Sequence, residues 1–473
     1  MTLTLDNPSY KYEIEAVLKI FFPQSRFVFA KTAEAPFLSV ITEKNAAIKI
    51  DCGGKIIEKT LEDTSENAVC REIYNALSSL TGQTSPWGIM TGIRPVKKVN
   101  DLLAAHKTEA EIREILREKY LLSDEKFELL LATANVQKSI LKPFDKRAFS
   151  LYVGIPFCPS RCSYCSFVSH SVKSASAKKL MQPYAEKLCL EIAETAKIAK
   201  DFSLKLQNIY VGGGTPTAIK SADLDMILSE IAKNFDISAA NEYTVEAGRA
   251  DTISPENLEV LKKHGATRIS INPQTMNDSV LAAIGRNHTS LDVKNAFFAA
   301  RAAGFDNINT DLITGLPTDT PEGFMHTLDE ITALSPESIT VHTLTLKRSS
   351  SLFSQMNVSN VPVALMTNYA EEKLPAMGYS PYYLYRQKNT VGNLENVGFA
   401  KKGFENLYNV YIMEETQTIL SAGAGGSTKL VSENGRIERV FNYKYPYEYV
   451  SDFGEILSRK NTVRKFYEEE LSL

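Results

Sequence analysis

Three cysteines lie close together in the stretch YVGIPFCPSRCSYCSFVSH, which covers residues 152–170. Cys158 is followed after three residues by Cys162 and after two more by Cys165, and a short apolar run precedes them. Thiols at this spacing have three readings. They are ordinary cysteines that happen to cluster, ligands of a zinc ion, or ligands of an iron–sulfur cluster.

The lack of a fourth cysteine nearby distinguishes a zinc site from an iron–sulfur cluster. A structural zinc site normally takes four protein ligands, usually as two separated pairs of cysteines, and no second pair occurs in this chain. A 4Fe-4S cluster is ordinarily held by four cysteines, so three thiolates on one loop leave one iron without a cysteine. We therefore expect a 4Fe-4S cluster held by Cys158, Cys162 and Cys165, with an open iron at which chemistry can occur.

The composition, 44% apolar and 23% charged residues, is that of an ordinary soluble globular protein. Six cysteines in 473 residues are too few for a disulfide scaffold, so Cys52, Cys70 and Cys189 are expected as small buried side chains. A net charge of −3 and the lack of a long Lys/Arg run argue against a nucleic-acid partner. No secretory signal and no run of ~18 apolar residues is present, so we expect a cytoplasmic protein without a membrane span.

Six apolar runs rich in β-branched residues alternate with helical segments from residue 151 onward. They are LYVGIPF, LQNIYVGG, EYTVEA, TRISINP, NINTDLITG and SITVHTLTL. Strands that alternate with crossover helices form a parallel sheet, and six units fall short of the eight that close a barrel. The predicted fold class is α/β, a partial (βα)6 TIM-like barrel.

A chain of this length is expected to form more than one domain. Residues 1–145 are predicted as an N-terminal α/β accessory domain, in which YKYEIEAVLKIFF is helical and RFVFA, PFLSVIT and AAIKIDC are strands. Residues 147–378 are predicted as the barrel and residues 379–473 as a C-terminal α+β domain that covers the substrate. The loop SPWGIMTGIRPVKK, with the single tryptophan Trp87, is expected to be a solvated turn, with an anion or partner site as the alternative.

Residues suited to a site follow the predicted strands at one end. Cys158 follows the first strand, residues 212–215 the second, Glu246 the third and Gln274 the fourth, and Asp311 lies within the fifth. The carboxyl ends of parallel strands form the ligand crevice of α/β sheets. These residues are therefore expected to converge.

The three-cysteine motif resembles the signature of the radical S-adenosylmethionine (SAM) enzymes. GGGTPT at 212–217 resembles that family's glycine-rich strand end, at which missing side chains let the backbone approach the methionyl amino group. YVGIPFC, GGGTPT, VEA, DLITGLP and the glutamine upstream of GRNH are together similar to the oxygen-independent coproporphyrinogen III oxidase group, over about residues 147–460.

The resemblance implies a SAM site and the residues that form it. By position they are Tyr152, Tyr164, Gly213, Gly214, Thr215, Glu246, Gln274, Arg286 and Asp311. Carboxylates can accept hydrogen bonds from ribose hydroxyls or the amino group, an arginine can pair the methionyl carboxylate, and tyrosines can pack beside the cluster or the adenine.

The resemblance also implies the reaction. The reduced cluster and SAM generate a radical that removes hydrogen from a propionate of coproporphyrinogen III, and loss of carbon dioxide and one electron leaves a vinyl group. Two rounds give protoporphyrinogen IX in porphyrin biosynthesis. The reaction implies a tetrapyrrole substrate, a low-potential electron donor and no catalytic acid–base residue beyond the cluster and SAM.

Two features set the chain apart within the group. Phe167 stands where the better-known oxidases carry a further cysteine, and in lacking that cysteine the chain is similar to the related heme chaperones. Those chaperones also carry a His-Asn-x-x-Tyr-Trp heme motif, which is missing here because no histidine follows His342. YYLYRQKNTVGNLENVG, residues 382–398, and the N-terminal region instead resemble a third branch, the coproporphyrinogen dehydrogenases. A heme chaperone and a radical SAM enzyme acting on heme or another tetrapyrrole remain the alternatives.

The C-terminal region from about Tyr379 is rich in tyrosine, which usually indicates core packing. A tetrapyrrole also needs aromatic walls, together with a few cations for its carboxylates. Arg348 and Arg386 are the predicted substrate-binding residues, because arginine grips a carboxylate through two parallel hydrogen bonds.

Overall fold

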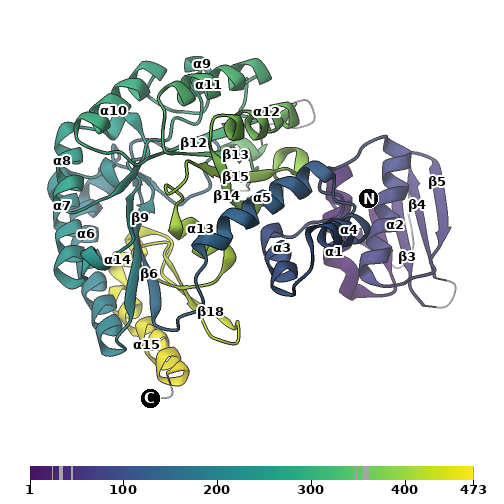
Figure 1. The fold of residues 1–473 in the computed structure, drawn as a ribbon, viewed down its shortest axis with the longest axis horizontal. Helices are drawn as coiled ribbons and strands as arrows, with labels where there is room; N and C mark the ends of the chain where they lie inside the picture. Colours follow the sequence, from purple (N-terminus) through teal and green to yellow (C-terminus); the bar gives the residue numbers. More distant parts are fainter. Residues whose placement is uncertain (24, 31–35, 44–45, 348, 355–361, 472–473) are drawn as a thin grey trace. The chain divides into compact units, whose positions relative to one another are not determined.

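The computed structural model describes residues 1–471 except 24, 31–35, 44–45, 348 and 355–361 (Figure 1). The chain divides into two compact units. Unit 1 comprises Met1–Asn135 and Leu384–Glu395, and unit 2 comprises Val136–Tyr383 and Asn396–Leu473. A separate C-terminal domain from residue 379 therefore stays a prediction.

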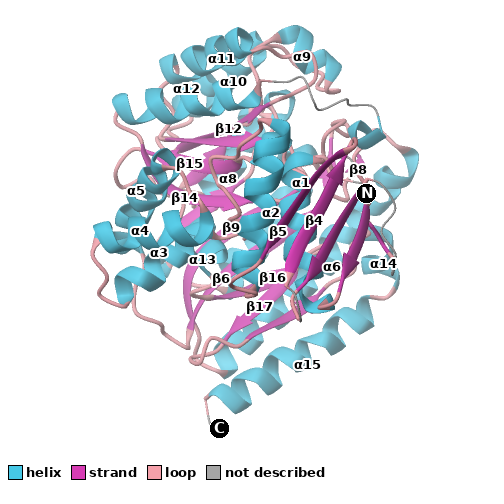
Figure 2. Cartoon of the chain, turned by 90° about the vertical axis from the view of Figure 1, so that its right-hand side faces the viewer, coloured by secondary structure: helices cyan, strands magenta, loops and turns pink. Residues whose placement is uncertain are grey.

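Unit 1 contains a five-stranded sheet in the order β2-β1-β3-β4-β5. Its strands are β1 (Thr2–Leu5), β2 (Val28–Phe29), β3 (Phe37–Ile41), β4 (Ala47–Cys52) and β5 (Lys55–Thr60). Its helices are α1 (Lys11–Phe21), α2 (Glu66–Thr81), α3 (Pro95–Ala104), α4 (Glu109–Tyr120) and α5 (Asp124–Ile140), the last of which continues into unit 2. Figure 2 shows α1 and α2 beside this sheet, and apolar residues such as Ile14, Ile48 and Ile73 fill the core between them.

The first part of the loop with Trp87, residues 85–90, is largely buried, whereas Gly92 and Ile93 are exposed. Trp87 is fully buried, its indole Nε1 donates to Glu395 Oε2 at 2.5 Å, and the ammonium of Lys126 lies 2.5 Å from Glu395 Oε1. The prediction of a solvated turn was therefore wrong for Trp87, whose polar partner lies more than 300 residues further along the chain.

Unit 2 is built on an eleven-stranded sheet in the order β14-β15-β13-β12-β11-β10-β9-β6-β16-β17-β18. Its strands are β6 (Ala148–Ile155), β9 (Lys205–Gly213), β10 (Glu242–Val245), β11 (Arg268–Ser270), β12 (Ile308–Thr314), β13 (Ser338–Thr343), β14 (Ser380–Arg386), β15 (Glu395–Ala400), β16 (Thr418–Ala422), β17 (Ser427–Val431) and β18 (Ile437–Phe441). Two further strands, β7 (Phe157–Cys158) and β8 (His170–Ser171), pair with each other.

The six predicted strands form the parallel core of this sheet. β6, β9, β10, β11, β12 and β13 pair in parallel in that order, which confirms the partial (βα)6 barrel of the α/β class. Strands buried on both faces read as continuous apolar runs, which is why the sequence predicts them well. β16 adds a seventh parallel strand beside β6, and β15 is antiparallel to β13.

Helices cover the outer face of the curved parallel strands (Figure 1). They are α6 (Ala175–Asp201), α7 (Ser221–Asn234), α8 (Pro255–Lys263), α9 (Asp278–Ala283), α10 (Ser290–Ala302), α11 (Pro321–Ala333) and α12 (Val363–Ala376). Later in the chain come α13 (Leu407–Glu414), α14 (Pro446–Ser451) and α15 (Phe453–Glu470). A search of the described residues finds no helix with the length and hydropathy that crossing a membrane requires.

Candidate active site

The three cysteines lie on one loop that leaves the first barrel strand. Cys158 ends β7, and Cys162 and Cys165 follow in a turn in which the Cys165 amide donates to the Cys162 carbonyl at 3.1 Å. All three are half-buried free thiols. Burial raises the pKa of Cys158 and of Cys165, and the neighbouring Cys162 raises both further.

The thiols are not arranged around one point. In the described part of the chain, no three His, Cys, Asp or Glu side chains meet at distances suited to a single metal ion. In a 4Fe-4S cluster each cysteine binds its own iron, so the sulfurs need not converge on one ion. Three thiols on one loop that do not converge on one point form a donor set that suits a polynuclear iron centre better than a lone zinc ion.

Arg249 fastens the cysteine loop to the barrel. Its guanidinium is 3% exposed and donates from Nη1 to Ser160 Oγ at 2.8 Å. Its other nitrogens bind Asp251 at 2.9 and 3.0 Å, and although burial opposes the change, His288 and Arg249 lower the pKa of Asp251 to about 2. Sequence reasoning missed Arg249, although its place three residues after Glu246 at a strand end was a usable signal.

Arg286 holds the other half of the loop. Its Nη2 donates to the hydroxyl of Tyr164 at 3.0 Å, and its buried Nε has no hydrogen-bond partner among the described residues. Burial alone would lower the pKa of Arg286, but Tyr164 and Cys162 raise it, so the guanidinium stays charged. A buried arginine with an unused donor beside the cysteine loop is suited to a carboxylate ligand.

The glycine-rich end of β9 packs directly on the cysteine loop. The amides of Gly214 and Thr215 donate to the carbonyls of Ile155 and Phe157 at 2.8 and 2.7 Å. A Cβ at position 214 would lie 2.5 Å from the Phe157 oxygen, and Gly213 has φ +107°. Thr215 Oγ1 lies 3.6 Å from Cys158 Sγ. Glycine is thus required here by backbone packing as well as by any cofactor.

Two carboxylates lie at the neighbouring strand ends. Glu246 follows β10 and accepts a hydrogen bond of 2.5 Å from the hydroxyl of Tyr210. Burial, with a contribution from Asp311, raises the pKa of Glu246 to about 7, against the opposing effect of Tyr210. Glu246 can therefore carry a proton near neutral pH.

Asp311, on β12, behaves in the opposite way. Burial would raise its pKa, but His342, whose Nε2 lies 3.8 Å away, and Asn309 lower the pKa, so Asp311 is ionised. The backbone N–H of Gln274 donates to the backbone carbonyl of Asp311 at 3.0 Å. Gln274 has φ +73°, a left-handed conformation that a glutamine rarely adopts. Such local strain is common where a backbone is shaped for a ligand.

A stack of tyrosines borders this edge. The rings of Tyr210 and Tyr408 lie 4.4 Å apart with planes 23° from parallel, and Tyr152 stacks at 6.1 Å from Tyr408. The Tyr152 hydroxyl is 3.4 Å from the space that a Cβ on Gly213 would occupy. Tyr408 comes from α13, and no local pattern in the sequence indicates that it joins the site.

The structure thus brings together the predicted cluster and SAM residues, all of which belong to unit 2. Arg386 lies inside unit 1, where it donates to the carbonyls of Met90 and Asn393 and stacks over Trp87 at 4.7 Å. Its guanidinium is occupied by packing, so a role in binding substrate carboxylates stays a prediction without structural support. Arg348 lies outside the described residues.

A partial parallel barrel with a three-cysteine loop at its carboxyl edge defines a class of proteins, and comparisons with known proteins agree. Residues 152–331 match the family described as Radical SAM superfamily. The chain is 38% identical over 411 residues to the oxygen-independent coproporphyrinogen-III oxidase-like protein HemZ of Bacillus subtilis, covering 85% of this chain and 82% of that protein. The chain belongs to the radical SAM superfamily, in the group of oxygen-independent coproporphyrinogen-III oxidase-like proteins.

Two other proteins extend the comparison. The heme chaperone HemW of Bacillus subtilis is 31% identical over 288 residues, which cover 59% of this chain and 70% of that protein. The solved structure of coproporphyrinogen III oxidase HemN from Escherichia coli matches with a TM-score of 0.50 at 22% identity, over 68% of this chain and 72% of that one, and supports the fold. Membership of the superfamily makes a 4Fe-4S cluster and SAM the cofactors.

Proposed function

We propose that this protein is a radical SAM oxidoreductase that converts coproporphyrinogen III to protoporphyrinogen IX without oxygen. The observation that carries the proposal is the extent of the similarity to the HemZ protein. It covers 85% of this chain, more than the 180 residues of the superfamily match alone. The similarity therefore extends well beyond the residues that define the superfamily.

The site residues have separable tasks in this proposal. Cys158, Cys162 and Cys165 each hold one iron, and Arg249 keeps their loop in place through Ser160. When bound, the cluster and SAM supply a radical that takes a hydrogen atom from a propionate, after which carbon dioxide and one electron leave and a vinyl group remains. A one-electron acceptor takes up that electron.

The remaining residues bind and orient SAM. The unpartnered Nε of Arg286 can pair its carboxylate, and the half-buried backbone at Gly213 and Gly214 can accept a hydrogen bond from its amino group. Ionised Asp311 accepts hydrogen bonds from hydroxyls, while Glu246, with its raised pKa, can also donate one. The chain's contribution is orientation and exclusion of water, and no residue is needed as a general acid or base.

The test is anaerobic turnover. Protein reconstituted with iron and sulfide is mixed with SAM, reductant, an electron acceptor and coproporphyrinogen III, and both 5′-deoxyadenosine and tetrapyrrole products are measured by mass spectrometry. We expect loss of two carboxyl groups per tetrapyrrole. Cleavage of SAM without decarboxylation under any reductant and acceptor would reject the proposal in favour of a radical enzyme that acts on heme or another tetrapyrrole.

A heme chaperone is the second candidate, because heme chaperones from several bacteria match at up to 31% identity. A pyridine-hemochrome assay after loading with heme distinguishes it. Stoichiometric heme that survives gel filtration, without turnover of coproporphyrinogen III, would favour the chaperone.

A further inference from the structure

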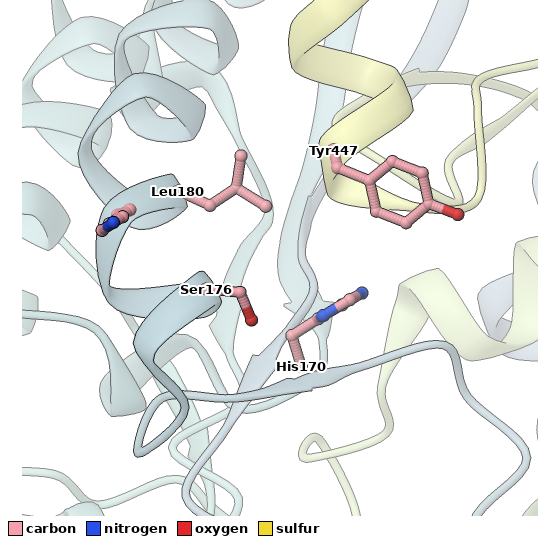
Figure 3. Close-up of a pocket in the computed structure, with 5 residues that line it drawn as sticks. His170, Ser176, Leu180 and Tyr447 are labelled. Carbon is pink, nitrogen blue, oxygen red and sulfur yellow. The ribbon is translucent and has the colours of Figure 1, made fainter.

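A pocket of about 360 Å³ opens beside the cysteine loop. Five residues line it: His170 on β8, Ser176, Lys179 and Leu180 on the first turns of α6, and Tyr447 on α14. Figure 3 shows His170 and Tyr447 on one side, facing Ser176 and Leu180 of α6 on the other. None of these residues takes part in the SAM site.

One strand connects the pocket to the first cysteine. β8 pairs in parallel with β7, so that Ser171 lies opposite Cys158. The amide of Val172 donates to the Cys158 carbonyl at 2.9 Å, and the amide of His170 donates to the Pro156 carbonyl at 2.9 Å. A short path of covalent and hydrogen bonds therefore leads from the pocket wall to a residue that binds the cluster.

The pocket has an exposed aromatic margin. Tyr447 is 50% exposed and Tyr445 is 41% exposed, and their rings stack at 5.4 Å. The ring of His170 meets that of Tyr447 edge-on at 6.3 Å. Tyrosines are enriched at protein interfaces.

The surroundings of the pocket are basic, although the chain as a whole is slightly acidic. No Asp or Glu occurs between Asp145 and Glu186, a stretch that holds six Lys and Arg residues. Lys173, Lys178 and Lys179 are exposed, and within the described residues none of them forms an ion pair. Across the pocket α14 adds Glu448 as its acidic residue, and exposed Lys444 precedes that helix.

The lysines are placed against the preference of the helix. Lys178 and Lys179 lie near the amino end of α6, which has no acidic residue in its first turn. That end of a helix carries partial positive charge, so cations there are unfavourable. The placement costs stability and strengthens a positive surface beside the cluster loop.

We infer that this pocket and its basic rim are the docking surface for a small acidic redox protein that delivers single electrons to the cluster. The inference rests on the proposed radical chemistry, in which the cluster gains one electron as the partner loses one. Acidic groups of the partner pair with Lys173, Lys178 and Lys179, and its surface residues cover His170 and Tyr447. Electron-transfer contacts are small and transient, and charge complementarity mainly raises their association rate.

The test compares two reductants on the same reconstituted holoprotein. In the variant Lys178→Glu/Lys179→Glu, reduction of the cluster by reduced flavodoxin, a small acidic flavoprotein, should slow at least tenfold at low salt. Reduction by the small molecule methyl viologen, in its reduced form, should keep its rate. The flavodoxin rate of the unaltered protein should fall steeply with added salt.

Lys197→Glu/Lys200→Glu is the matched control, because it reverses two exposed lysines at the other end of the same helix. It should retain the flavodoxin rate. Acidic residues at the amino end favour the helix, so Lys178→Glu/Lys179→Glu should melt no lower than the unaltered protein, which separates docking from misfolding.

Equal slowing with both reductants, equal slowing in the control variant, or an unchanged flavodoxin rate would each overturn the inference. A changed sedimentation coefficient of Lys178→Glu/Lys179→Glu would instead assign the surface to contact with a second copy of the chain. Because the readout is cluster reduction, the result does not depend on whether coproporphyrinogen III is the substrate.

Discussion

Each unit of the molecule contains a buried arginine with an unpartnered Nε, and the two differ in electrostatic surroundings. In unit 1, Arg386 is held by backbone carbonyls and Trp87, and burial lowers its pKa to about 10, although Glu395 opposes the change. In unit 2, Tyr164 and Cys162 outweigh burial and raise the pKa of Arg286. The pKa of each arginine thus follows the balance between burial and the nearby groups that can carry negative charge, and Arg286 is the one that lies beside the cysteine loop.

The cysteine loop gives the largest expected effect. Cys162→Ala should abolish productive binding of the cluster, whereas the unaltered protein should bind about four iron and four sulfide per chain after anaerobic reconstitution. Iron and sulfide analysis provides the measurement. Cys70→Ala is the control, because Cys70 is buried in the core of unit 1. Unchanged iron content in Cys162→Ala would contradict the assignment of all three cysteines as ligands.

Arg386→Ala tests whether Arg386 stabilises unit 1 by packing. It leaves a cavity against Trp87 and removes donors from two carbonyls, so we expect the free energy of unfolding of unit 1 to fall by about 3 kcal/mol. Denaturant unfolding followed by Trp87 fluorescence measures this, because Trp87 is the single tryptophan. Cluster content and SAM binding should be retained. A stable variant that fails only in tetrapyrrole turnover would restore the substrate role.

Arg286→Gln tests whether Arg286 binds the carboxylate of SAM. Loss of one charge-assisted contact should weaken SAM binding by roughly ten- to a hundredfold, corresponding to about 1.5–3 kcal/mol. Isothermal titration calorimetry on the reconstituted protein provides the measurement. Unchanged affinity together with a lower melting temperature would place Arg286 in the same class as Arg386.

Glu246→Gln gives the smallest effect and depends on pH. The pKa of Glu246 is raised to about 7 in the folded protein from 4.5, so the stability that this shift provides is complete below pH 4.5 and is lost as pH rises through 7. Glutamine does not ionise. In SAM-free protein we therefore expect the variant to be more stable than the unaltered protein at pH 8, with little difference at pH 5. A difference independent of pH would show that ionisation is not the cause.

The features that the sequence predicted correctly are those that a local pattern of residues encodes. Six apolar β-branched runs identified the parallel strands, and parallel topology then implied that Glu246, Gln274 and Asp311 meet at one edge. The exposed strand β5 was missed because its residues lack an apolar alternation. The burial of Trp87 was missed because its polar partner is distant in the sequence, and no local pattern records such a pair.

The place of β16 in the sheet has a consequence for synthesis of the chain. β6 carries the cysteine loop and ends at Ile155, but its neighbour β16 begins only at Thr418. At about 5–20 residues per second, a ribosome needs on the order of tens of seconds to make the intervening chain. Throughout that interval one edge of β6 presents unpaired amides and carbonyls, which other strands can join. The nascent protein therefore passes through a stage that favours aggregation, and a chain that ends before residue 418 remains in it.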